Sequence, residues 1–204
     1  EVAAQMAVEI IGEAFANFSV EADPEDTMKA AIEKANEAIF QMSQDLPQLS
    51  SMATTVVGLH IAHEVATIAH VGDSRLYRLD PTGRLFRETA DHSVVEEEVR
   101  AGRMTPEQAA THPSRNVISR ALGAEPTVKI DLKMQIVKPA TKFLLCTDGV
   151  TRHIDDWELA AILSSGDSVQ QMCNEIKRIC FDRGAEDNLT AIIVEAVGTN
   201  DAVV

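Results

Sequence analysis

The sequence lacks the features that mark secreted, membrane-spanning or metal-thiolate proteins. Its cysteines, Cys146, Cys173 and Cys180, show no metal-binding spacing and cannot all pair with one another. No apolar run is long enough to span a bilayer, and no basic segment followed by an apolar one opens the chain as a signal peptide would. We therefore expect a cytoplasmic protein without a membrane partner, whose cysteines are reduced core residues.

Positive charge is also scarce. The chain has 18 Lys and Arg against 32 Asp and Glu, which gives a net charge of -14. Such a balance argues against nucleic-acid backbones and anionic membrane surfaces as partners. The excess acid is spread along the chain rather than gathered in a tail, so its simplest role is solubility.

The composition is that of an ordinary globular protein. The chain has 204 residues, of which 45% are hydrophobic and 25% are charged. It contains no internal repeat and no low-complexity linker. A single domain over residues 1–204 is therefore favoured over two small ones.

Two helices are predicted at the start of the chain. Residues 1–18 carry apolar side chains at helical spacing. A second helix begins where Asp23 can cap its first turn and Pro24 suits the first helical position. It should end before Pro47, which cannot continue a helix.

Short runs rich in Val, Ile, Thr and Leu follow. Because only two or three residues separate successive runs, the pattern favours one antiparallel meander of strands. The predicted strands cover residues 54–61, 65–71, 75–80 and 84–89.

Residues 91–123 form a long polar insertion with two short helices, the second started by Thr105 and Pro106. Such insertions between strands are often functional. Within it, His92 is expected to be structural, as is His70 before it, and Arg120 is expected to pair with a nearby acid.

The rest of the chain returns to strands and helices, which makes the expected fold class α+β, an antiparallel sheet with helices packed outside. Strands are predicted over residues 127–137 and 189–197, the latter central because it is mostly apolar. Helices are predicted over residues 155–163, with Trp157 in the core, and 168–180.

Three acids follow or interrupt strands in a way that suggests a metal site. Asp148 follows the apolar run Phe143–Cys146 and precedes a glycine. Asp73 lies in a Gly-Asp-Ser turn, and Asp187 precedes Asn188. Carboxylates that could converge without a histidine or cysteine pattern favour a hard divalent cation such as Mg²⁺ or Mn²⁺.

The order and spacing of five motifs resemble the metal-dependent protein serine/threonine phosphatases, the PP2C or PPM family, and the bacterial branch most closely. The resemblance covers essentially the whole chain. The motifs are Val71-Gly72-Asp73-Ser74-Arg75-Leu76-Tyr77, Ala90-Asp91-His92-Ser93, Asn116-Val117-Ile118-Ser119-Arg120-Ala121-Leu122-Gly123, Cys146-Thr147-Asp148-Gly149-Val150 and Glu186-Asp187-Asn188-Leu189-Thr190.

The resemblance implies a four-layer α-β-β-α sandwich, in which two antiparallel sheets are flanked by helix pairs. It implies hydrolysis of phosphoserine and phosphothreonine by a metal-activated water, with phosphorylated proteins and their kinase as partners. We expect the protein to be a monomer. Residues 91–123 correspond to the family's flap. No residue for binding the substrate is assigned.

The same resemblance assigns the metal ligands. Asp148 and Asp187 match two ligands of the paired Mn²⁺ or Mg²⁺ ions, and Asp73 matches a ligand of a third, weaker ion. Asn188 is expected to orient Asp187 or a metal-bound water. Gly149 is expected to contribute through its backbone.

The sequence departs from the family pattern at its beginning. The family's early segment, with a phosphate-binding arginine, further acids and a glycine loop, has no counterpart here, and Glu1 resembles a residue just after that loop. The resemblance thus implies that the first strands are missing. The alternative function is a catalytically inactive fragment or pseudophosphatase that acts as a binding module.

Overall fold

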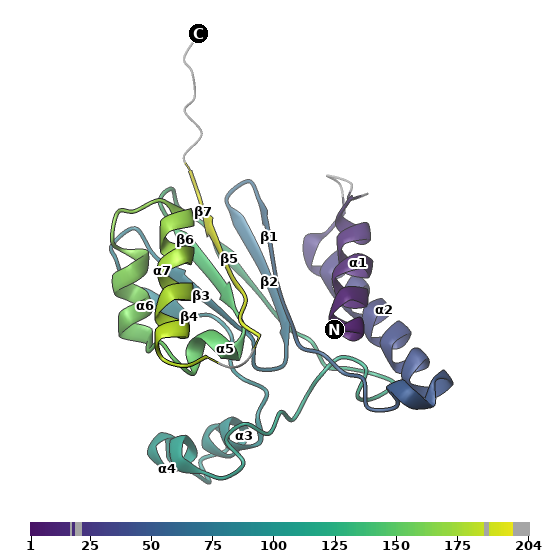
Figure 1. Ribbon diagram of the computed structural model, residues 1–204. Coiled ribbons are helices and arrows are strands. Elements are labelled where there is room, and N and C mark those ends of the chain that lie inside the picture. Colours follow the sequence, from purple (N-terminus) through teal and green to yellow (C-terminus); the bar gives the residue numbers. More distant parts are fainter. Residues whose placement is uncertain (17, 19–21, 186–187, 198–204) are drawn as a thin grey trace. The chain divides into compact units, whose positions relative to one another are not determined.

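The computed structural model describes residues 1–16, 18, 22–185 and 188–197, which divide into two compact units. Each unit has its own sheet (Figure 1). Each also has its own hydrophobic core. The first unit comprises Glu1–Ala62, Ala66–Asp73 and Asp91–Gln135, and the second comprises His63–Val65, Ser74–Ala90 and the chain from residue 136 onward.

The first unit is a three-stranded sheet covered by two helices. The strand order is β1 (Val56–Ala62), β2 (Val65–Val71) and β5 (Asp131–Ile136). Helices α1 (Val2–Ala16) and α2 (Pro24–Asp45) pack on this sheet through small and branched side chains. The buried contacts include Ala3, Ala7, Ile32, Ala35, Ile39, Ala69 and Val71.

Helix α2 begins as the sequence predicts. The side chain of Asp23 accepts a 2.7 Å hydrogen bond from the Glu25 amide, and Pro24 occupies the first turn. The helix ends at Asp45, before the short 3₁₀ helix η1 (Pro47–Leu49). Among the described residues, no helix combines the length and the apolar character that crossing a membrane requires.

The second unit is a four-stranded antiparallel sheet with its own helices on one face (Figure 1). The strand order is β4 (Leu85–Arg87), β3 (Arg75–Leu79), β6 (Lys142–Cys146) and β7 (Ala191–Glu195). The helices are α5 (Asp148–Thr151), α6 (Asp156–Leu163) and α7 (Val169–Asp182). Their inward side chains, among them Leu159, Met172 and Ile176, pack on Tyr77 and Leu144 of the sheet.

The two sheets with their helices confirm the α+β class and the two antiparallel sheets flanked by helix pairs. The single meander is wrong, because β2 and β3 belong to different sheets. Gly72, between them, has φ of 110°, and its N–H and C=O bond to His92 rather than across a hairpin. A Cβ there would lie 2.3 Å from Thr55 Cγ2, so the chain leaves one sheet through a turn that only glycine fits.

Two further expectations about the second unit are wrong. Trp157 is 71% exposed, because it lies two positions from the buried Leu159 and therefore on a different face of α6. Strand β7 is last in the described sheet order rather than central. Its side chains alternate, with Ile193 packed on the core and Ile192 52% exposed.

The state of the cysteines and the length of strand β5 can also be compared with the sequence predictions. All three cysteines are free thiols, with Cys146 and Cys180 buried and Cys173 half-buried. This agrees with reduced core residues. Strand β5 covers only Asp131–Ile136 of the predicted 127–137, because Pro126 and the residues after it follow an irregular path.

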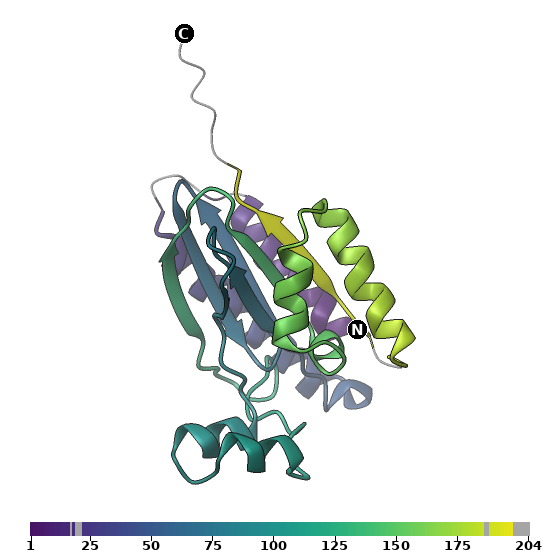
Figure 2. The ribbon, with the colours of Figure 1, turned by 90° about the vertical axis from the view of Figure 1, so that its left-hand side faces the viewer.

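Residues 91–123 contain the two short helices that the sequence predicts, α3 (Val94–Arg100) and α4 (Pro106–Thr111). Ser93 caps α3, and Thr105 forms a capping box with Gln108. Figure 2 shows α3 and α4 standing apart from α1 and α2 of the same unit. Residues 91–123 therefore carry their two helices away from the helices that cover the sheet of the first unit.

One end of this segment is fixed by the buried side chain of Asn36 on α2. Its Oδ1 accepts a 2.9 Å hydrogen bond from the Gly123 amide, and its Nδ2 donates to the Glu125 carbonyl at 3.1 Å. Gly123 has φ of 82°, and a Cβ there would lie 2.2 Å from Ile39 Cγ2. Helix α2 thus sets where the segment ends.

We predict that Gly123→Ala destabilises the protein much more than Gly83→Ala. Both glycines have left-handed backbone, but only Gly123 faces a neighbour within 4 Å. The conformational cost alone is about 1 kcal/mol, and overpacking adds about 1–3 kcal/mol at Gly123. Thermal unfolding of the two variants measures the difference, and equal midpoints would contradict this packing.

Candidate metal centre

Asp148 is placed by the most buried strand of the second unit. Strand β6 pairs with β3 on one side and β7 on the other, and Phe143, Leu144 and Cys146 are almost completely buried. The strand ends at Cys146, Thr147 follows, and Asp148 begins helix α5. Its side chain is about 30% exposed, so the end of this buried strand fixes a carboxylate at a position that solvent can reach.

The turn at Asp148 is bound to the segment before β7. Thr147 donates its amide to the Thr190 carbonyl at 3.1 Å, and the Thr190 amide donates to Thr147 Oγ1 at 3.0 Å. Gly149 is buried, and a Cβ there would lie 2.6 Å from the Asn188 carbonyl oxygen. Only glycine allows this close approach, so the structure brings two of the predicted residues, Gly149 and Asn188, together.

Asp187 lies outside the described residues. Asp73 belongs to the first unit, where it follows Gly72 and is half-buried. The metal-ligand roles of Asp73, Asp148 and Asp187 therefore stay predictions.

A cation already faces Asp148. The guanidinium Nη2 of Arg152, four residues further on, forms an ion pair with Asp148 Oδ2, and the Arg152 side chain is 42% exposed. Accessible carboxylate oxygen is the donor that Mg²⁺ and Mn²⁺ prefer. Asp148 thus fits a divalent cation by its donor chemistry and by its partial exposure to solvent.

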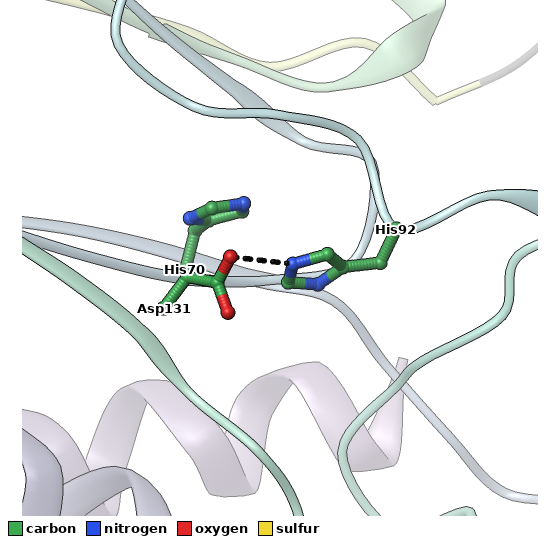
Figure 3. A group of neighbouring side chains, drawn as sticks. All are labelled: His70, His92 and Asp131. Atoms are coloured by element: carbon green, nitrogen blue, oxygen red, sulfur yellow. Dashed lines mark ion pairs between the residues drawn. The ribbon is translucent and has the colours of Figure 1, made fainter. Parts of the chain in front are cut away.

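The first unit contains a buried histidine network that sequence reasoning did not find. His92 is completely buried, and its main-chain N–H donates to the Gly72 carbonyl at 2.9 Å. The Gly72 amide donates in return to His92 Nδ1 at 3.0 Å. The rings of His70 and His92 stack with centroids 4.5 Å apart (Figure 3).

The protonation state of His92 follows from these bonds. Because Nδ1 accepts from Gly72, Nε2 carries the proton, and it lies 3.3 Å from Asp131 Oδ2 (Figure 3). Burial lowers the pKa of His92 to about 4, and the nearby positive charge of Arg120 acts in the same direction. Burial opposes ionisation of Asp131, but hydrogen bonds from Arg120 and His92 hold its pKa below the usual value.

His70, His92 and Asp131 have ligand atoms within 4.8 Å of one another, which by itself would suit a metal ion. The guanidinium of Arg120 enters this group. Its Nη1 lies 2.9 Å from His92 Nε2 and donates to Asp131 Oδ1 at 2.9 Å. Arg120 thus supplies the positive charge that Asp131 attracts, as the expected pairing with a local acid predicts.

The network closes the base of residues 91–123. His92 lies near the start of the segment and Arg120 near its end, and the Ser119 amide donates to the His92 carbonyl at 2.8 Å. Val94 and Val117 add a 3.0 Å backbone bond. His92 therefore holds the segment and the turn before Asp73 at once.

Comparisons with known proteins place the chain in a family. A family model described as protein phosphatase 2C matches residues 1–193. The serine/threonine phosphatase stp of Listeria welshimeri is 32% identical over 198 residues, which cover 96% of this chain and 78% of that protein. Protein phosphatase PhpP of Streptococcus pneumoniae is 31% identical over 196 residues, covering 95% of this chain and 78% of that protein.

Solved structures of serine/threonine phosphatases support the same family assignment. The serine/threonine phosphatase PstP/Ppp of Mycobacterium tuberculosis superposes with a TM-score of 0.89 at 28% identity, covering 97% of this chain and 82% of that one. The catalytic domain of PstP in complex with two manganese ions has a TM-score of 0.86 at 27% identity, covering 97% of this chain and 81% of that one. The chain therefore belongs to the protein phosphatase 2C family, the metal-dependent serine/threonine phosphatases that its motifs resemble.

We predict that the free energy of unfolding decreases as the pH is lowered below 6.5, because His92 is buried in its neutral form. Its folded pKa, about 4, lies below the ordinary 6.5, so the folded state resists protonation. The stabilisation is complete above pH 6.5 and is lost as the pH falls toward 4, by about 2 kcal/mol at pH 5. Urea unfolding followed by circular dichroism at pH 7 and pH 5 measures this loss.

The variant His92→Asn tests the assignment, because the amide can accept from Gly72 but does not titrate. It should flatten the pH dependence. The control is His63→Asn, at an exposed residue with φ of 53° that asparagine tolerates, and it should keep the full dependence. An unchanged pH dependence in His92→Asn would show that another group is responsible.

Proposed function

We propose that this chain is a protein serine/threonine phosphatase that hydrolyses phosphoserine and phosphothreonine at a dinuclear Mn²⁺ or Mg²⁺ centre. The observation that carries the proposal is Asp148, a partly exposed carboxylate fixed at the end of a buried strand. Family membership supplies the reaction class. The manganese ions of PstP support the choice of metal.

Asp148 and Asp187 would hold the paired ions, and Asp73 a third, weaker one. When bound, the ions would lower the pKa of a bound water and offset the negative charge of the phosphoryl group. The contribution of this chain is to hold the aspartate side chains in fixed positions. The hydrogen bonds between Thr147 and Thr190 fix the turn that carries Asp148.

Asn188 and Gly149 serve this arrangement differently. Gly149 lets the Asp148 turn approach the Asn188 carbonyl, which keeps the residue after Asp187 beside the residue after Asp148. A shared ion needs such closeness, since Mn²⁺ and Mg²⁺ ligands lie little more than about 2 Å from the ion. The Asn188 side chain would orient Asp187 or a metal-bound water.

The proposal extends to the whole chain. Residues 1–204 would form a single catalytic domain, with residues 91–123 as a flap over the substrate. Phosphorylated proteins are the substrates, and the kinase that phosphorylates them is the opposing partner. A cytoplasmic monomer is the form we propose. The alternative of an inactive binding module has no observation in its favour, and the relatives are named as phosphatases.

The test is hydrolysis of p-nitrophenyl phosphate by the full-length protein with and without Mn²⁺. We expect activity that requires Mn²⁺ and is lost in Asp148→Asn, by roughly a hundredfold or more, because a ligand of the metal pair is neutralised. Asp187→Asn should behave alike.

The matched control is Asp167→Asn, which neutralises an exposed acid before helix α7 and should leave turnover unchanged. Full activity in both Asp148→Asn and Asp187→Asn would show that the site is assigned wrongly. Absence of Mn²⁺-dependent turnover in the unmodified protein would contradict the proposed reaction.

A further inference from the structure

The ion pair between Asp148 and Arg152 is built into one helical turn. Asp148 is the first residue of α5 and Arg152 caps its end, four residues later. The Arg152 amide donates to the Asp148 carbonyl at 2.9 Å, which fixes the backbone of both. Residues four apart on a helix face each other, so the guanidinium is held where it can reach the carboxylate.

Arg183, another arginine of the second unit, is engaged with groups other than Asp148. Arg183 Nη1 donates to Glu158 Oε2 at 2.8 Å and also contacts the His153 carbonyl. That pairing anchors α7 to α6 and leaves Asp148 alone. Arg152 is therefore the cation that this turn itself presents to Asp148.

A guanidinium and a divalent ion on one carboxylate repel each other, even where they contact different oxygens. The ion takes a carboxylate oxygen as a ligand, and its double charge repels a guanidinium held a few ångströms away. The Arg152 side chain is long and 42% exposed, so its guanidinium lies where solvent can reach it. Ion uptake at Asp148 would therefore weaken or displace its ion pair with Arg152.

We propose that Arg152 competes with the catalytic divalent cation for the carboxylate of Asp148 and so sets the metal affinity below what the ligands alone would give. The inference rests on the proposed function, in which Asp148 is a metal ligand. Arg152 acts as a positioning residue that occupies the carboxylate before the ion arrives.

An ordinary surface ion pair would not behave this way. The same unit offers such a pair for comparison, since Arg178 on α7 pairs with Glu175 at 2.7 Å and Asp182 at 2.6 Å, all exposed. Arg178→Gln removes the same charge as Arg152→Gln, at a place without a predicted metal ligand. It therefore separates a local effect at Asp148 from a change of net charge.

The experiment is calorimetric titration of Mn²⁺ into the full-length protein at fixed ionic strength. We expect Arg152→Gln to bind Mn²⁺ about threefold to tenfold more tightly than the unmodified protein, since both competition and repulsion are removed. Arg152→Ala should shift the affinity in the same direction, and Arg178→Gln should leave it unchanged. Circular dichroism checks that each variant is folded.

Asp148→Asn separates the two ways of failing. If Asp148→Asn weakens Mn²⁺ binding while both Arg152 variants bind as the unmodified protein does or more weakly, the competition is wrong and the metal ligand stands. If Asp148→Asn binds Mn²⁺ unchanged, the proposed metal centre itself is wrong. Equal tightening by Arg178→Gln would reduce the effect to net charge and overturn the inference.

Discussion

The burial of strand β6 is the constraint on which the second unit depends. Its side chains are enclosed and its backbone pairs with strands on both sides. A slip by one residue would exchange the side chains of its two buried faces, move the polar neighbour Lys142 or Thr147 into the buried stretch and break the register with both neighbouring strands. The end of the strand is therefore fixed, and with it the position of Asp148.

The residues around this end convert a fixed strand into a site for a cation. Gly149 allows close approach to the Asn188 segment, and the paired hydrogen bonds between Thr147 and Thr190 keep the two segments together. Without a bound ion, the guanidinium of Arg152 balances the negative charge of Asp148. A buried network in the first unit plays the corresponding part for the turn before Asp73, where His92 binds both polar groups of Gly72.

Much of this could be predicted from sequence, because it depends on local chemistry. The caps Asp23, Ser93 and Thr105 and the strand before Asp148 are each determined by a few neighbouring residues. The motif order also predicted the family, which the comparisons confirm.

The errors and omissions depend on contacts between distant residues. The turn at Gly72 looks like a hairpin until Thr55 and His92 are placed around it. No spacing along the chain relates His92 to Asp131. The only signal in the sequence was that His92 and Arg120, which both pair with Asp131, each lie inside a family motif.

The most direct measurement is the anomalous diffraction of manganese in crystals of the full-length protein grown with Mn²⁺. We expect manganese peaks within ligand distance of the carboxylates of Asp148 and Asp187, with the Arg152 guanidinium displaced from Asp148. Manganese bound only at other residues, with Asp148 still paired to Arg152, would contradict it.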